Sequence, residues 1–190
     1  TRELLNKPET IAISEALGRV LADPVRAPIQ VPGHDNSAMD GYAFAYESLT
    51  NSQTLQLAGK ALAGAPFDGV CQLGQCIRIM TGGKLPDGCD TVEMQENCVV
   101  DKANITFTQD KKLGQNVRYT GEDIAKNTLV LKRGQRLSAV DLGLLASLGI
   151  AQTLVYQPIK VALIATGDEL KSPGQLLKAG DIYESNNKSC

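Results

Sequence analysis

Between Val25 and Asn127 the apolar residues occur in short runs of strand length, separated by turn-forming residues. Gly and Pro, of which the chain has 18 and 8, punctuate this region, as is typical of strands joined by tight turns. We expect strands at residues 42–45, 54–60, 76–80, 91–95, 98–100 and 105–108, with a hairpin turn at 101–104. The pattern predicts an α+β fold that is mainly β, with a compact β domain at its centre.

Helical patterns flank this β-rich region. Ser14 is placed to cap a helix that Pro24 ends. Ser138 is placed to cap a second helix, with Asp141 as an acidic variant of the capping box and Gly149 as the residue after its C-terminus. The apolar positions of the two helices are Ala16, Leu17, Val20 and Leu21 in the first, and Leu144, Leu145 and Leu148 in the second. Strands are also expected at 129–131 and 150–156.

Residues 159–165 form a nearly continuous apolar run, Ile-Lys-Val-Ala-Leu-Ile-Ala. Such a run is typical of a strand buried on both faces in a parallel α/β sheet. A parallel strand needs a crossover and a partner strand, and only a short, mostly polar segment follows. The chain is therefore expected to end inside a domain, with residues 159–190 weakly ordered because the strand lacks a partner.

Composition excludes several classes of function. The formal net charge is −2 with both signs interspersed, so a nucleic-acid partner is not expected. No apolar stretch is long enough for a membrane helix, so no membrane partner is expected either. The five cysteines include no C-x-x-C pair and the chain has one histidine, which argues against a zinc site. An odd number of unpatterned cysteines suits a reducing, cytoplasmic location.

The most informative segment is residues 31–43, Val-Pro-Gly-His-Asp-Asn-Ser-Ala-Met-Asp-Gly-Tyr-Ala. Four oxygen-bearing side chains fall within six residues of this loop: Asp35, Asn36, Ser37 and Asp40. Such a loop can offer hard oxygen ligands to a cation such as magnesium. The alternative is an Asx-type turn whose side chains satisfy its own backbone.

A second segment, residues 77–83, runs from a predicted strand into Thr81-Gly-Gly. Exposed backbone N–H groups beside a hydroxyl can cradle an anion. The spacing of a nucleotide P-loop is absent, and an ordinary glycine turn is the alternative.

A third segment, residues 114–124, places Arg118 near the acidic pair Glu122 and Asp123. The arginine can bind an oxyanion and the carboxylates a metal. The alternative is a surface ion pair that contributes little energy.

A fourth segment places Asp168 and Glu169 directly after the apolar run, where ligands bind in open α/β sheets. His34 is expected to form structural hydrogen bonds, and the cysteines to serve as small core residues.

The order of these motifs is more specific than any one of them. D-N-S-A-M-D-G-Y-A, R-I-M-T-G, G-Q-N-V-R-Y-T-G-E-D-I, A-S-L-G-I and A-T-G-D-E-L follow one another along the chain. Over residues from about 13 to 186 this series resembles the molybdopterin molybdenumtransferase family of MoeA and the gephyrin E domain. The resemblance implies molybdenum cofactor biosynthesis, in which molybdenum from molybdate is inserted into adenylated molybdopterin with magnesium.

The resemblance also implies roles for individual residues. Asp40, Thr81 and Asp123 match the family's catalytic positions, and Asp40, Asp123 and Glu169 are the implied metal ligands. Ser37, Arg118 and Asp168 are the implied substrate-binding residues.

The implied architecture has three parts. Residues 8–26 and 128–158 would form an elongated dimerisation domain, 27–127 an inserted β domain, and 159–190 the truncated start of a molybdopterin-binding α/β domain. In the implied homodimer, Asp40, Thr81 and Asp123 of one subunit face Glu169 of the other. The pterin's adenylyltransferase is a further expected partner.

The sequence departs from the family pattern at Glu93, which replaces a usually apolar residue. A buried, unpaired carboxylate is costly, so we expect Glu93 to face solvent or to pair with a cation. The remainder of the pterin-binding domain and the final β domain of the family are absent, so the chain alone is expected to be inactive. Two alternatives stay open at this point: a non-catalytic, gephyrin-like scaffold module, and a sugar- or nucleotide-binding β domain.

Overall fold

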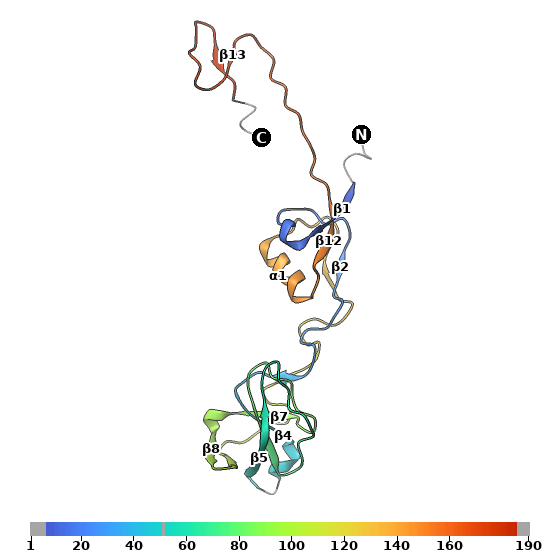
Figure 1. Ribbon diagram of the computed structural model, residues 1–190, viewed down its shortest axis with the longest axis vertical. Helices are drawn as coiled ribbons and strands as arrows, with labels where there is room; N and C mark the ends of the chain where they lie inside the picture. Colours follow the sequence, from blue (N-terminus) through green and yellow to red (C-terminus); the bar gives the residue numbers. More distant parts are fainter. Residues whose placement is uncertain (1–6, 51, 186–190) are drawn as a thin grey trace.

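The fold is that of a computed structural model, which describes residues 7–50 and 52–185. Three parts follow one another along a long axis (Figure 1). We call them the β region (residues 36–118), the middle region (8–26 and 128–156) and the C-terminal segment (157–185). The connecting chains 27–35 and 119–127 run side by side between the first two, joined by an antiparallel bridge of Val31 with Ile124. The molecule is mainly β, as predicted.

The β region is built on a six-stranded sheet with the strand order β7-β4-β6-β5-β9-β8. All neighbouring strands are antiparallel except β5 and β6, which are parallel. The strands are β4 (Gly41–Phe44), β5 (Thr54–Ala61), β6 (Gln75–Ile79), β7 (Thr91–Met94), β8 (Cys98–Asp101) and β9 (Asn104–Phe107). Each of the six predicted strands is present within one or two residues, and the predicted turn joins β8 to β9. Short 3-10 helices η2 (Tyr46–Leu49) and η3 (Gln95–Asn97) follow β4 and β7.

The sheet packs a core on each face because side chains alternate along its strands. One cluster includes Phe44, whose ring centroid lies 4.7 Å from that of Phe107. The other includes Ile77, Ile79 and Val92. Two cores on one small sheet leave its strands little freedom to shift in register.

The middle region is assembled from two segments that lie on either side of the β region in sequence, 8–26 and 128–156. Strand β1 (Pro8–Ala12) pairs antiparallel with β12 (Gln152–Tyr156), and β2 (Val25–Arg26) pairs with β11 (Leu129–Leu131). Helix α1 (Ala139–Ser147) packs against them. One core cluster contains residues of both segments: Ala16, Leu21, Leu131, Leu137, Leu145 and Val155. The domain boundaries and the dimerisation role expected from the resemblance stay predictions.

Helix α1 begins and ends where the sequence predicts. Asp141 N–H donates to the Ser138 hydroxyl at 3.3 Å, and Ser138 N–H donates to the Asp141 carboxylate at 2.8 Å. This reciprocal capping box satisfies backbone donors that the first turn leaves free. Gly149 follows the helix with φ 73°, a conformation that favours glycine.

The helix predicted after Ser14 is wrong. The chain forms only a 3-10 turn, η1 (Ile13–Glu15), and Gly18 then adopts φ 75°. Val20 and Leu21 form antiparallel bridges with Arg136 and Val155. Backbone pairing with residues 136 and 155 prevails over helix propensity here, and it accompanies full burial of Leu21, whereas Leu17 is 62% exposed.

The strand predicted at residues 159–165 is also absent. The segment is extended and its apolar side chains are exposed, with Ile164 84% exposed. Within the described residues it pairs with no strand, so its backbone forms no ladder. Two short strands follow, β13 (Leu170–Lys171) and β14 (Ile182–Tyr183), which are parallel. Weak order in this segment stays a prediction.

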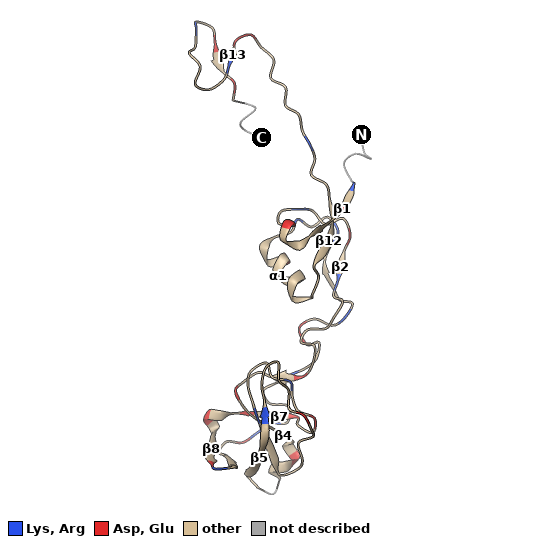
Figure 2. Cartoon of the chain, viewed as in Figure 1, with Lys and Arg blue, Asp and Glu red and all other residues tan. Residues whose placement is uncertain are grey.

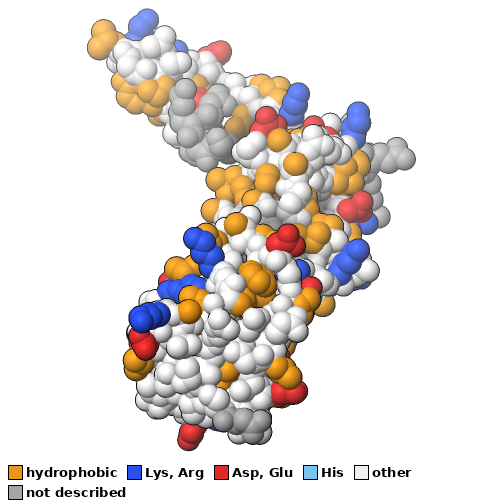
Figure 3. Space-filling view, turned by 60° about the horizontal axis from the view of Figure 1, so that its bottom comes forward, with side chains coloured by type: hydrophobic (Ala, Val, Ile, Leu, Met, Phe, Trp, Pro, Cys, Tyr) orange, Lys and Arg blue, Asp and Glu red, His pale blue; other side chains and the backbone are white. Residues whose placement is uncertain are grey.

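Charged residues are distributed along the whole length of the molecule (Figure 2). On the face seen in Figure 3, both signs of charge occur, and several Lys and Arg side chains lie near one another at the left of the lower part. Among the described residues, no helix has both the length and the apolar character needed to cross a membrane.

Candidate functional site

The carboxylate of Asp40 is bound by Thr81. Asp40 directly precedes β4 and Thr81 lies two residues beyond β6, and the pairing of Gly41 with Ile79 brings the two together. Thr81 donates to Asp40 Oδ1 through its backbone N–H at 2.7 Å and its hydroxyl at 2.8 Å. These two bonds lower the pKa of Asp40, backbone donor first. The Asp40 carboxylate is therefore held ionised at the surface by a residue 41 positions away in sequence.

Ser37 stabilises the loop that carries Asp40. Its side chain is 1% exposed, and its hydroxyl both donates to Met39 O at 2.5 Å and accepts from Met39 N–H at 3.2 Å. Its backbone bonds Gly82 and Gly83 in the segment after Thr81. The turn alternative weighed for this loop therefore describes Ser37 well. Its substrate-binding role stays a prediction.

Arg118 lies in β10 (Val117–Arg118), which pairs antiparallel with β3 (Asn36–Ser37). Its guanidinium is 2.6 Å from Glu122 Oε1 through Nε and 2.6 Å from Asp123 Oδ1 through Nη2. Glu122, and then Asp123, raise the pKa of Arg118, while Arg118 lowers the pKa of Glu122. An oxyanion that binds Arg118 must compete with two carboxylates.

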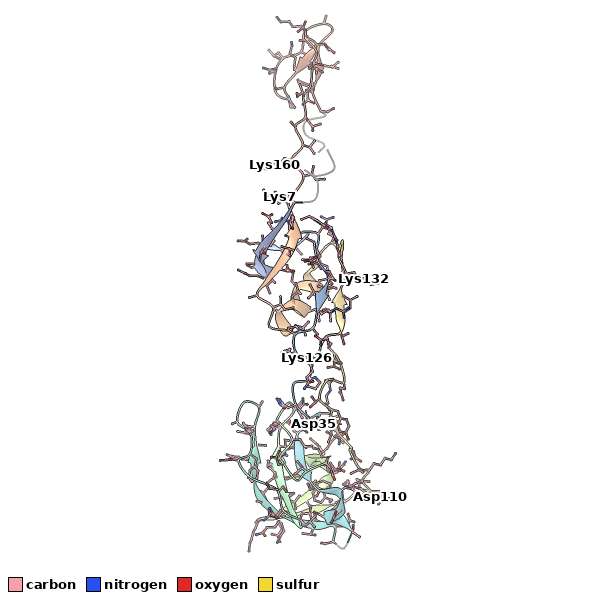
Figure 4. The ribbon with its side chains drawn as sticks, turned by 90° about the vertical axis from the view of Figure 1, so that its right-hand side faces the viewer. Lys7, Asp35, Asp110, Lys126, Lys132 and Lys160 are labelled. Atoms are coloured by element: carbon pink, nitrogen blue, oxygen red, sulfur yellow. The ribbon has the colours of Figure 1, made fainter. Side chains whose placement is uncertain are left out.

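Asp35 joins the loop of Asp40 to the segment that follows Arg118. It accepts hydrogen bonds from the Thr120 hydroxyl and backbone N–H, both at 2.7 Å, and these bonds lower its pKa. Asp35 lies at the end of the β region where the connecting chains arrive (Figure 4). Sequence reasoning did not single out Thr120, because the contact spans 85 positions and depends on the pairing of β3 with β10.

A polar hollow of about 410 Å³ lies beside this joint. Its lining includes Asp35, Thr120, the exposed His34, Lys84 and Asp87. The ammonium group of Lys84 and the carboxylates of Asp35 and Asp87 border the same space, so the hollow suits a polar ligand. Five of the predicted site residues are thus linked by neighbouring contacts: Asp40 bonds Thr81, Ser37 bonds the backbone just after Thr81, and the β3–β10 pair joins Ser37 to the strand of Arg118, which binds Asp123.

Asp168 and Glu169 lie elsewhere. Both precede β13 in the C-terminal segment, at the opposite end of the molecule from the β region (Figure 1). Lys171 Nζ donates to the Asp168 backbone oxygen at 2.8 Å. Within one chain, the predicted site residues therefore form two groups and not one.

Comparison with known proteins identifies the family. A model of the MoeA N-terminal region, domains I and II, matches residues 1–149. The chain belongs to the MoeA family. It is 45% identical over 179 residues to a molybdopterin molybdenumtransferase of Haemophilus influenzae, covering 94% of this chain and 44% of that protein. It is 32% identical over 201 residues to gephyrin of Dictyostelium discoideum, covering 96% of this chain and 28% of that protein.

A solved structure supports the same assignment. The molybdopterin biosynthesis MoeA protein of Pyrococcus horikoshii OT3 superposes with a TM-score of 0.89 at 32% sequence identity, covering 97% of this chain and 53% of that one. The chain spans a little under half the length of the MoeA transferases it matches, at 44% and 46%. Molybdenum cofactor biosynthesis is the process in which these relatives act.

The four cysteines that the structure describes in this MoeA chain lie in or against the two core clusters of the β region. Cys71 and Cys76 are buried, and Cys89 and Cys98 are half-buried. Burial raises the pKa of Cys76 to about 12 and that of Cys98 to about 11, so their thiolate forms are scarce. Cys190, predicted to be another core residue, lies outside the described residues.

Magnesium binding by this chain stays a prediction. The part of the chain that the structure describes has no group of three His, Cys, Asp or Glu residues that could enclose a metal. Asp40, ionised and at the surface, nevertheless suits one ligand position. Protein-bound magnesium commonly takes one or two carboxylates, with waters and substrate phosphates completing the shell.

Proposed function

We propose that this chain provides one side of a molybdenum-insertion site, with molybdate and adenylated molybdopterin as substrates. Membership of the MoeA family supports the process. The contact between Asp40 and Thr81, next to the strand pair that carries Arg118, is the observation that supports the site. It combines an ionised hard-oxygen ligand with N–H, O–H and guanidinium donors, which are the groups that a cation and an oxyanion require.

The proposed chemistry of these residues follows from their present partners. Asp40 accepts both Thr81 donors, and Glu122 and Asp123 occupy Arg118. Neutralising these carboxylates frees Thr81 and Arg118 to bind and orient molybdate and the phosphate of the adenylate. Asp40 and Asp123 are the proposed magnesium ligands of this chain. Magnesium, when bound, would polarise a phosphoryl oxygen during cleavage of the adenylate.

The proposed site is completed by a second copy of the chain. Asp168 and Glu169 lie far from the β region within one chain, so only a partner subunit can bring Glu169 to Asp40 as a third ligand. A two-fold dimer places each β region beside the partner's C-terminal segment. Transfer of the pterin from its adenylyltransferase, in the cytoplasm, belongs to the same proposal. Sedimentation of the purified protein tests it, because a monomer at assay concentrations would contradict a site shared between subunits.

The enzymatic test uses the protein from the complete reading frame, with adenylated molybdopterin, molybdate and magnesium. Asp40→Asn should lower kcat/KM for molybdate about 100-fold and Thr81→Val about tenfold, because each removes a charge or a donor at the reacting groups. Thr54→Val is the matched control, since its hydroxyl bonds that of Thr106, 2.8 Å away in the same sheet and on strands that do not carry Asp40 or Thr81. A wild-type rate for Asp40→Asn would contradict the proposal.

A further inference from the structure

Glu93 and Lys111 form a buried ion pair inside the β region. Glu93 Oε2 lies 3.0 Å from Lys111 Nζ, and the two side chains are 1% and 2% exposed. Burial raises the pKa of Glu93, but hydrogen bonds from Asn97 and Lys111 outweigh this effect, and the net pKa is lowered. The expectation that Glu93 faces solvent is wrong, and the alternative that it pairs with a cation is confirmed.

The Oε1 atom of Glu93 organises the segment that supports Asp40. It accepts from Met94 N–H at 2.9 Å and from Asn97 Nδ2 at 2.8 Å, at the start and end of η3. The first residue of η3, Gln95, donates its backbone N–H to Asp40 O at 3.1 Å. Glu93 is therefore connected through η3 to the backbone of Asp40, the residue whose carboxylate binds Thr81.

The Oε2 atom organises the segment that leads to Arg118. Besides Lys111, it accepts from Gln115 Nε2 at 3.1 Å. The neighbouring Asn116 donates its side chain to Val92 O at 3.1 Å and accepts Ala38 N–H at 2.9 Å. Residues 111–116 are thereby fixed between β7 and the Asp40 loop directly before β10 begins.

A buried ion pair is a poor way to gain stability. Desolvation of both charges offsets their attraction, and apolar residues of similar volume commonly stabilise a core as well or better. A buried pair can instead select one arrangement among several. The two oxygens of Glu93 face the two segments that carry the proposed site, and no buried polar side-chain atom in the described residues is left without a partner.

We propose that Glu93 is a positioning residue, whose two carboxylate oxygens fix the Asp40 segment and the Arg118 segment relative to one another. The claim that this arrangement serves molybdenum insertion rests on the proposed function. The positioning itself does not, and it can be tested without substrate.

Two variants separate the two sides of the carboxylate. Glu93→Gln/Lys111→Met removes both charges together and retains an oxygen for η3, but loses the acceptor that faces residues 111–116. Asn97→Ala removes a partner only on the η3 side. Thr54→Val, in the same sheet, controls for loss of a polar contact away from Glu93.

Amide hydrogen exchange measured by NMR reports separately on the segment held by Oε1 and the segment held by Oε2. The Ala38 amide reports the Arg118 segment and the Gln95 amide the Asp40 segment, through their bonds to Asn116 O and Asp40 O. Exchange at Ala38 should accelerate about tenfold relative to the core amide of Ile77 in the double variant, with Gln95 unchanged. Asn97→Ala should give the reverse. If both amides respond alike in both variants, or neither responds, Glu93 is an ordinary core residue and the proposal is overturned.

Molybdate titration of the same proteins distinguishes the two proposals. If Glu93 positions a working site, the double variant should bind molybdate about tenfold more weakly than Thr54→Val. Equal affinity of these two proteins would contradict the functional half of the inference. A wild-type protein that binds no molybdate would instead contradict the proposed function, and the exchange pattern would still decide whether Glu93 positions the two segments.

Discussion

The loop of Asp40 and the loop of Asp168 and Glu169 look alike in sequence, but the structure treats them differently. Each places carboxylates beside glycine next to an apolar strand-like run. In the β region, strands distant in sequence surround the Asp40 loop, and Thr81 and Thr120 bind its carboxylates. In the C-terminal segment, contacts are local, such as Ile182 N–H to Glu169 O at 2.9 Å.

The sequence motif alone does not determine the surroundings of such a carboxylate, because it is the sheet that brings Thr81 to Asp40. The geometry of Asp40 follows from the register of β4 on β6 and on β7. Residues 159–165, by contrast, expose the side chains that a sheet would bury. Substitutions in the two parts of the molecule can break or sharpen this contrast.

Gly41→Ala should destabilise the β region by about 3 kcal/mol. A Cβ at Gly41 would lie 1.8 Å from the Glu93 backbone oxygen, so β4 and β7 must separate. Urea unfolding measures the loss. Gly143→Ala is the control, because the space around that helical glycine is open and alanine should stabilise α1 by about 1 kcal/mol. Equal stability of Gly41→Ala and wild type would mean that β4 and β7 do not approach so closely.

Asp35→Ala should lower the free energy of unfolding by about 1.5 kcal/mol at neutral pH. This is the lower end of the range for hydrogen bonds to a charged group, because Asp35 is partly exposed. Thr120 lowers the pKa of Asp35 below its ordinary 3.8. A lowered folded-state pKa contributes stability above the unfolded value, and this contribution is lost as pH falls through the folded value. The gap between variant and wild type in urea unfolding should be full at pH 7 and shrink below about pH 4. A gap independent of pH would contradict the charged hydrogen bonds.

The sequence predicted the local elements well and the long-range ones poorly. Strands β4 to β9 and the capping of α1 follow from residue pattern and cap chemistry. The helix after Ser14 was predicted in error. Its apolar spacing carries no information about the bridges that Val20 and Leu21 form with Arg136 and Val155.

The site shows the same division. Asp40, Thr81 and Arg118 could be named from motifs, and the ion pair of Arg118 with Glu122 and Asp123 was among the sequence alternatives because these residues are close in sequence. The bonds of Thr81 to Asp40 and of Thr120 to Asp35 could not be foreseen, since they join segments 41 and 85 positions apart. For Glu93, the cost of a buried charge predicted a cation, but nothing in the spacing selected Lys111 among the lysines.

Ser138→Ala should destabilise the middle region by about 1 kcal/mol, the usual cost of losing an N-cap. The Asp40 loop should be unaffected, because the middle and β regions have separate core clusters. Exchange of the Leu142 amide, which bonds Ser138 O, should accelerate while that of the Thr81 amide does not. Acceleration at both would show that the two regions unfold together.

The smallest effect is expected where the sequence looked most like a core. Val161 is 75% exposed, and so Val161→Ser should change the free energy of unfolding by less than about 0.5 kcal/mol. Val92, fully buried in β7, is the matched position, and Val92→Ala should cost about 2 kcal/mol because it leaves a cavity. Both variants are compared by urea unfolding at a protein concentration where the chain is monomeric. A large loss for Val161→Ser under those conditions would mean that residues 159–165 are buried within the single chain, and the contrast between the two loops would then fail.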